Sequence, residues 1–243
     1  MNRIRHWVIV LLLLSPGVSA QEYVVTPKGI RVRLESIHWG VPSPFPRSSK
    51  TPMQRLTFYF DEQGERVLHG LYALIYLTGE YKEFTTFNHG VKDGPFARWF
   101  DKGLKEVEGQ YEDGNLEGTV TWYYKSGSIK ERHHYVKGKL HGAFTAYFEN
   151  GVKQEEGAIF NDRREGPFVG YHNNGSKAYQ GTYVHGFLAG TITVFRETGA
   201  KLGEGNLNRG LIVGTWRCFD YRDERVTERK DCHQLYYQDC TCP

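Results

Sequence analysis

The residues of this chain with the most chemical potential are its histidines and cysteines. His133 and His134 stand together in "RHHY", and His141 follows in "KLHG". A structural zinc site needs Cys or His ligands at short, regular spacings, which these histidines do not follow. We therefore expect solvent-facing turn residues here, with no metal site and no cofactor.

Catalytic motifs are missing from the sequence. It has no Gly-x-Ser-x-Gly of a serine hydrolase, no His-Glu-x-x-His of a metalloprotease and no phosphate-binding loop. An enzyme needs reactive groups that converge in a pocket. The sequence therefore predicts a protein that is not an enzyme and has no catalytic residues.

All four cysteines lie near the end of the chain, at Cys218, Cys232, Cys240 and Cys242. An even number of cysteines in an exported chain indicates disulfides. A bond between Cys240 and Cys242 would be strained, because a single residue separates them. The two remaining pairings both join Cys218 and Cys232 to the C-terminal tail. The alternative is a zinc site that includes His233, although Cys-x-Cys is not the usual spacing for structural zinc.

Residues 1–20 have the layout of a secretory signal peptide. Arg3 and Arg5 precede the apolar run "VIVLLLL", and "GVSA" ends in small residues before a predicted cleavage after Ala20. The alternative, a membrane anchor, needs roughly 20 apolar residues, and this run is shorter. We therefore predict an exported protein, either periplasmic or secreted.

The charge balance argues against nucleic acid as a partner. The formal net charge of the full chain is +3, and removal of Arg3 and Arg5 with the signal peptide lowers it to +1. A nearly neutral protein does not attract phosphate groups or anionic lipids over a distance. We expect no nucleic-acid binding and weak or no membrane binding.

Glycines recur along the chain with a period of 24 residues. The first column contains Gly70, Gly94, Gly118, Gly142, Gly166, Gly190 and Gly214. Another column contains Gly109, Gly157, Gly181 and Gly205, and His133 interrupts it. A further column contains Gly90, Gly114, Gly138, Gly186 and Gly210, and Asp162 interrupts it. Aromatic residues keep the same period, as in Trp99, Tyr123, Tyr147, Tyr171, Phe195 and Phe219.

The segments between these glycines predict β-strands. "TVTWYY" and "AFTAYF" are rich in aromatic and β-branched residues, and "KSG" and "ENG" are typical of turns. Each repeat is therefore predicted to be a β-hairpin, and hairpins stacked in series bury one continuous face. The predicted fold class is all-β, an elongated, twisted antiparallel sheet of tandem 24-residue hairpins.

The predicted organisation has four parts. After the signal peptide, residues 21–66 form an N-terminal β cap with the proline-rich loop "VPSPFPRSSKTP". Residues 67–219 form the hairpin repeats, and residues 220–243 form a cysteine-rich C-terminal cap. Caps are expected because the end units of a repeat stack need covered edges.

The repeat pattern resembles a known family. "YEDGNLEGTVTWYYKSG" and "YVKGKLHGAFTAYFENG" are similar to the MORN-type repeat, in the variant found in bacterial antitoxin and immunity proteins. The chain departs from the pattern at His133 and Asp162. The resemblance implies a β-hairpin stack that binds a partner, which is a toxin in the antitoxin proteins. MORN-type repeats have also been linked to lipid binding.

One column of residues is a candidate binding surface. Six residues after each first-column glycine the side chains change from aromatic to polar along the chain, whereas a core ladder should stay apolar. With a tryptophan from the neighbouring column, the candidate anchors are Phe100, Trp122, Tyr124, Phe148, His172 and Arg196. Exposed aromatic and arginine side chains are favoured at interfaces. The alternative is a partly covered core with ordinary surface variation.

The sequence thus predicts an exported, non-catalytic protein that binds another protein. With the family resemblance, the most specific expectation is an immunity protein that binds a cognate toxin and blocks its active site. That toxin could be a lipase or hydrolase that attacks the cell envelope. The alternative is an envelope or membrane-associated scaffold that binds lipid or other proteins.

Overall fold

The computed structural model describes residues 23–25, 31–33, 35–40, 53–76, 80–101, 103–220 and 226–229, and residues 235, 238, 240 and 242 of the tail. The predicted signal peptide, the proline-rich loop and Cys232 lie outside the described residues. Every regular element within these ranges is a β-strand, which confirms the all-β prediction. Accordingly, this part of the chain contains no helix that could cross a membrane.

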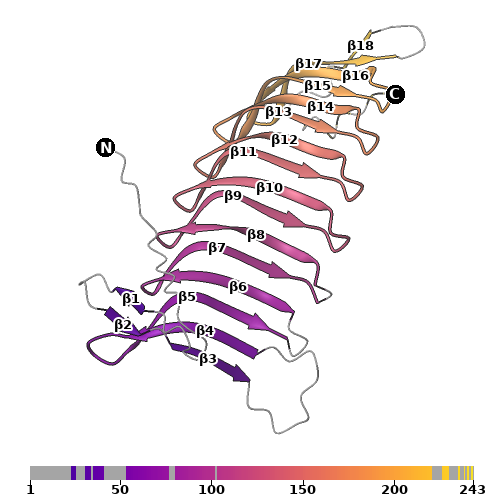
Figure 1. The fold of residues 1–243 in the computed structure, drawn as a ribbon. Helices are drawn as coiled ribbons and strands as arrows, with labels where there is room; N and C mark the ends of the chain where they lie inside the picture. The colour runs from indigo at the N-terminus through magenta and orange to yellow at the C-terminus, as the bar shows by residue number, and fades with distance from the viewer. Residues whose placement is uncertain are drawn as a thin grey trace.

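Within the described residues, sixteen strands form one open antiparallel sheet in which each strand pairs with its neighbours in sequence (Figure 1). The strands are β3 (Glu35–Gly40), β4 (Met53–Phe60), β5 (Arg66–Ile75), β6 (Tyr81–Asn88), β7 (Val91–Trp99), β8 (Lys105–Glu112), β9 (Asn115–Tyr123), β10 (Ile129–Val136), β11 (Lys139–Tyr147), β12 (Lys153–Phe160), β13 (Arg163–Tyr171), β14 (Lys177–Val184), β15 (Phe187–Phe195), β16 (Lys201–Asn208), β17 (Leu211–Phe219) and β18 (Val226–Arg229). A separate pair consists of β1 (Tyr23–Val25) and β2 (Arg31–Arg33). The hairpin series predicted from the glycine period is therefore confirmed, and the sheet continues through β4 and β3.

Tight turns join the strands at one end of each repeat. Between β8 and β9, Asp113 and Gly114 have φ angles of 46° and 82°, as a type I′ hairpin turn requires. Asp162 occupies the glycine position of one such turn and keeps the same left-handed conformation, with a φ of 64°. Its carboxylate accepts a 2.8 Å hydrogen bond from the Leu140 backbone N–H of the preceding repeat. This contact explains how an aspartate can replace the glycine.

The first-column glycines bend the strands in the middle. Gly142 on β11 has a φ of 114°, and the register between β10 and β11 shifts opposite it, between His133 and Tyr135. Such irregularities kink a strand and increase the local twist. The same shift recurs from repeat to repeat, so the sheet curls along its whole length (Figure 1). The curl gives the sheet an inner face and an outer face.

The inner face carries the core. A ladder of side chains two residues after the first-column glycines is buried, and it consists of Val120, Phe144, Phe168, Ile192 and Trp216. Val120 and Trp216 are each only 1% exposed, although a single layer of sheet lies behind them. Trp216 is covered by the C-terminal tail, which places Cys240 in the same buried cluster.

The outer face carries rows of paired charges and tyrosines. Lys105 donates a 2.6 Å hydrogen bond to Glu108, and the Tyr123 hydroxyl donates to the same carboxylate. Lys153, Glu156 and Tyr171 repeat this arrangement two hairpins later. These groups are partly exposed, so each ion pair contributes little to stability.

The C-terminal tail folds back onto the inner face of the last repeats. Cys218 on β17 forms a disulfide with Cys242, and Cys240 is buried in the core cluster beside Trp216. The Ile212 backbone N–H donates a 2.9 Å hydrogen bond to the Leu235 carbonyl, on a part of β17 that β18 does not pair with. The predicted disulfide link between Cys218 and the tail is confirmed.

Candidate binding surface

Five of the six predicted anchors lie where strands end and turns begin. They are Phe100, Tyr124, Phe148, His172 and Arg196, and the backbone N–H of each bonds to the carbonyl four residues further on. Three of these side chains also reach the next repeat. The Tyr124 hydroxyl donates to the Tyr147 carbonyl at 2.7 Å, and Arg196 donates to the Phe219 carbonyl at 3.1 Å. The column therefore links the turns of neighbouring repeats.

His172 makes the equivalent link in its repeat. Its Nε2 lies 3.0 Å from the Phe195 carbonyl oxygen. A carbonyl can only accept, so Nε2 carries the proton in this contact. A tyrosine, a histidine and an arginine thus serve the same purpose at equivalent positions. This explains why the column can change from aromatic to polar without disturbing the fold.

The sixth predicted anchor, Trp122, lies on the inner face of β9. Its ring meets His133 edge to face, with ring centroids 5.4 Å apart, and lies 6.4 Å from the ring of Tyr135. His133 in turn stacks on Phe144, at 6.0 Å and an interplanar angle of 13°. Trp122 therefore belongs to an aromatic cluster that spans β9, β10 and β11.

His133 fits at a glycine position because the residue beside it is small. Elsewhere in this column the ring from the ladder covers the glycine; a Cβ on Gly157 would lie 2.9 Å from the Phe144 ring. His133 pairs instead with Val120 on β9 and with Phe144 on β11. Because Val120 lacks a ring, the histidine ring takes up that space. Val120 and His133 thus form a pair across β9 and β10 at the positions where Phe144 and Gly157 pair one repeat later.

Trp122 also lies in a row of residues that crosses the inner face, and we call the part of this row from β9 onward the transverse row. Each member pairs directly with the next across neighbouring strands, so all of them lie on one face of the sheet. The transverse row consists of Trp122, Glu131, Ala146, Glu155, Gly170, Tyr179, Val194, Gly203 and Cys218. Large rings at Trp122 and Tyr179 flank a stretch with two carboxylates and two small residues.

The two carboxylates of this row have basic neighbours. Glu155 accepts two hydrogen bonds from Arg164, whose guanidinium lies 4.9 Å from the Phe144 ring centre and 5.2 Å from that of Tyr183. Glu131 lies 3.2 Å from His133 Nε2. Charged groups and aromatic rings thus alternate on the inner face, which offers both apolar contact and hydrogen bonding to a partner.

We call Trp122, Glu131, His133, Glu155 and Arg164 the inner cluster. The side chains of Glu131 and Arg164 are 33% and 39% exposed, so a partner can reach them. The sequence prediction found only Trp122. His133 was visible as a break in the glycine column, but its contacts depend on the curl. Among the described residues, no group of His, Cys, Asp or Glu side chains is suited to holding a metal ion.

The fold and this surface define a class of protein: tandem β-hairpin repeats in a single curled, open sheet. Three consecutive units, residues 116–137, 140–162 and 164–185, match the family model for the MORN repeat variant. These three units are therefore MORN-type repeats, as their motifs predicted. A search of curated proteins found no match. The inner cluster lies entirely within the matched units.

Repeats of this family suggest a protein that binds proteins or membranes, and they are generally binding or scaffold units. The Cys218–Cys242 disulfide agrees with folding in an oxidising environment, where such bonds persist.

Proposed function

We propose that this protein is an exported immunity protein that binds a cognate toxin along its inner face. The inner cluster supports this proposal, because it presents exposed charge and aromatic rings on an otherwise apolar face. Interfaces favour Trp, Tyr and Arg side chains held on rigid elements. Here they project from paired strands, so little conformational entropy is lost on binding.

Binding would inhibit the toxin by covering its active site. The partner would contact Trp122 and Arg164 centrally, and the column Phe100, Tyr124, Phe148, His172 and Arg196 would border the contact. Repeat proteins commonly use such extended curved surfaces for binding. A partner that attacks the cell envelope, such as a lipase or hydrolase, fits a protein that acts outside the cytoplasm. The predicted signal peptide and the disulfide support that location.

The test uses residues 21–243 as bait in envelope and secreted fractions of the source organism. A captured protein supports the proposal only if it has hydrolytic activity that falls to background at a one-to-one ratio. We expect Trp122→Ala to weaken binding by about tenfold or more, as at interface hot spots. A captured protein that remains active in the complex would contradict toxin inhibition.

Phe187→Ser is the matched control for Trp122→Ala. Leu188 packs against the core cluster on the inner face, so its neighbour Phe187 points to the outer face. Phe187 is 53% exposed, and its replacement should not disturb the core. The control variant should inhibit the toxin as well as the unaltered protein does.

A second candidate function is an envelope scaffold that binds lipid. The observation that favours it is a group of apolar side chains near the ends of β12, β14 and β15. Phe160, Val184 and Phe187 are 55%, 43% and 53% exposed. Exposed apolar patches mark protein or membrane contacts. Under this alternative, Phe187→Ser lowers sedimentation with phosphatidylglycerol vesicles and Trp122→Ala does not.

A further inference from the structure

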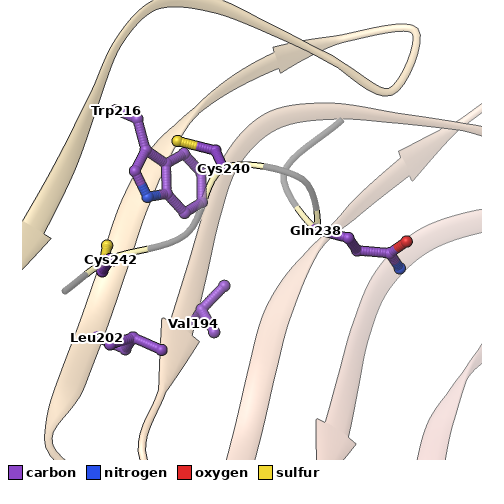
Figure 2. Close-up of a pocket in the computed structure, with 7 residues that line it drawn as sticks. Val194, Leu202, Trp216, Gln238, Cys240 and Cys242 are labelled. Carbon is purple, nitrogen blue, oxygen red and sulfur yellow. The ribbon is translucent and has the colours of Figure 1, made fainter. Parts of the chain in front are cut away.

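A hollow of ≈ 350 Å³ lies on the outer face of the last repeats, over β15, β16 and β17. The C-terminal tail is on the opposite side, where Cys240 and Cys242 stand beside Trp216 (Figure 2). Because Trp216 points to the inner face, its chain neighbours on β17 point to the outer face. The hollow is therefore separate from the inner cluster and does not depend on the proposed function. Its polar lining consists of Thr191, Glu204, Asn206, Thr215, Arg217 and Glu228.

Arg217 forms a wall of this hollow, because a long side chain stands here at a position that is small in the earlier repeats. Thr121 and Thr193 occupy equivalent positions and are only 9% and 7% exposed, so they form a low floor. The Arg217 side chain is 57% exposed and lies 3.8 Å from Glu204 and 3.9 Å from Glu228. Both distances are longer than a hydrogen bond, so the guanidinium keeps donors available for a ligand.

The carboxylates equivalent to Glu204 in earlier repeats each accept two hydrogen bonds from side chains. Glu108 accepts from Lys105 through one oxygen and from the Tyr123 hydroxyl through the other. Glu156 repeats this arrangement two hairpins later, again with a lysine and a tyrosine. A tyrosine hydroxyl is therefore part of the usual surroundings of this carboxylate.

Glu204 lacks the second of these hydrogen bonds. It accepts from Lys201 at 3.0 Å, but Phe219 stands at the tyrosine position and has no hydroxyl. The other oxygen of Glu204 is the one nearer to Arg217, and no donor within the described residues lies within hydrogen-bond distance of it. The last repeat thus leaves open an acceptor site that a hydroxyl fills elsewhere in the sheet.

Asn206 adds donors to the hollow. The Thr191 hydroxyl donates to the side-chain oxygen of Asn206 at 3.0 Å, which leaves the amide N–H groups of Asn206 available. Donors from Arg217 and Asn206 therefore stand beside acceptors from Glu204 and Glu228. An anion would meet two carboxylates and a cation would meet the guanidinium. Hydroxyl groups both donate and accept, so they match this mixture.

We propose that this hollow binds a neutral sugar unit. One sugar hydroxyl donates to the open oxygen of Glu204, where earlier repeats place a tyrosine hydroxyl, and accepts from Arg217. Hydrogen bonds linked in this way strengthen one another. Neighbouring hydroxyls reach Glu228 and Asn206. The volume of the hollow is near the lower end for small-molecule sites, so the site takes a unit of one or two sugar rings.

The test follows the Arg217 Nε–H and the Asn206 side-chain amide in ¹H–¹⁵N NMR spectra of residues 21–243, with signals assigned from Arg217→Thr and Asn206→Ala. The probes are cellobiose, lactose and N,N′-diacetylchitobiose, with inorganic phosphate as the charged comparison. We expect at least one disaccharide to shift these signals saturably, with an affinity that changes less than about twofold with salt, because salt screens only charged ligands. No saturable shift with any disaccharide, or tighter binding of phosphate, overturns the proposal.

Phe219→Tyr tests the assigned contact directly, because it gives Glu204 the hydroxyl that its counterparts already have. The new hydroxyl competes with the sugar, so binding should weaken about two- to tenfold. Arg217→Thr restores the small residue of the earlier repeats and should weaken binding about tenfold or more, since hydrogen bonds from charged groups are stronger. Unchanged sugar binding in either variant would contradict the contacts proposed here.

Arg132→Thr is the matched control. Arg132 occupies the position equivalent to Glu204 in an earlier repeat, where it pairs with Thr121 and Thr145. Its replacement removes an outer-face arginine several strands away from the hollow, so sugar binding should be unchanged. An equal loss of binding in Arg132→Thr and Arg217→Thr would contradict a local site. Thermal unfolding of each variant verifies that it is folded.

A longer sugar chain identifies the source of the unit. If the site takes the end of a glycan, the hexasaccharide with the linkage of the bound disaccharide should bind at least as tightly and shift the same signals. If the site takes a free sugar, the disaccharide should bind and the hexasaccharide should bind more weakly.

Discussion

His133 stacks on Phe144 in a space that the smaller side chain of Val120 leaves open. The small residue and the ring have exchanged places between β9 and β10. In three other repeats the ladder residue is a phenylalanine and the next strand supplies a glycine, as in Phe144 and Gly157. In this repeat the next strand supplies the ring, so the inner face gains a titratable group and an edge-to-face contact with Trp122.

This relationship predicts a compensating pair of substitutions. Val120→Phe places a second ring where His133 lies, and overpacking of this kind costs about 1–3 kcal/mol. Combining Val120→Phe with His133→Gly restores the Phe–Gly pair of the other repeats, so the double variant should recover most of that loss. Urea unfolding of the single and double variants measures both values. If the losses of unfolding free energy caused by Val120→Phe and His133→Gly simply add in the double variant, the proposed exchange of rings is wrong.

The disulfide between Cys218 and Cys242 should contribute strongly to stability. It closes a chain segment of 24 residues and fixes the tail over Trp216. A loop of this length corresponds to about 3.5 kcal/mol in the chain-entropy model. We expect Cys218→Ser with Cys242→Ser to lower the free energy of unfolding by about that amount. Binding to the inner cluster, measured with the captured partner, should remain, since the cluster lies several strands away.

The histidines near the first repeats should make stability depend on pH. His69 and His89 have ring centroids 4.8 Å apart, and Tyr59 Oη lies 2.9 Å from His89 Nδ1. Burial lowers the pKa of both histidines, and the nearby charge of His89 lowers the pKa of His69 further. The folded state therefore binds fewer protons than the unfolded state below the ordinary histidine pKa. Stability should fall as the pH drops below about 6.5.

His89→Asn tests this dependence, because asparagine tolerates the positive φ of 47° at this turn. The loss of stability on acidification should become smaller in this variant. His185→Asn is the control; it changes the same turn position in a later repeat, where the side chain is 84% exposed. If both substitutions change the loss of stability on acidification equally, groups other than His69 and His89 cause the pH dependence.

Tyr123 on the outer face should titrate at unusually high pH. Burial, followed by its hydrogen bond to Glu108, raises the pKa of Tyr123 to about 12. The proton on Tyr123 therefore stabilises the fold at neutral pH, and this stabilisation is lost as the pH rises from about 10 toward 12. Glu108→Gln should lower the pKa of Tyr123, and ultraviolet absorbance of tyrosinate measures it. Glu106→Gln, on the same strand, should leave the pKa unchanged.

Much of the fold could be predicted because the glycine and aromatic columns share one period. The columns place turns and strands in order, and strands joined by tight turns must pair with their neighbours. The glycine pattern alone does not explain Asp162. Its carboxylate accepts a hydrogen bond from a backbone N–H of the preceding repeat, and this contact depends on how the strands pair in the folded sheet. The link between Cys218 and the tail could be predicted, but the choice of Cys242 depends on how the tail crosses Trp216.

The candidate site was less predictable for a physical reason. Trp122 was recognisable as a large side chain at a position that is small in later repeats. The expectation that His133 is a solvent-facing turn residue was wrong, because His133 lies on β10 and its side chain is only 18% exposed. The curl at the first-column glycines turns Glu131 and His133 toward the core ladder, and that curl comes from register shifts rather than from composition. The contacts that Tyr124 and Arg196 make with the next repeat also depend on this stacking.

Pairing only between sequence neighbours has a consequence for how this protein can change over time. A strand in the middle of the sheet contacts the hairpin before it and the hairpin after it, and nothing more distant. A duplication or loss of 24 residues would therefore rejoin equivalent positions and leave every remaining ladder intact. The inner face can thus become longer or shorter by whole hairpins during evolution. Its length can then fit a partner of different size while the packing of the remaining core is unchanged.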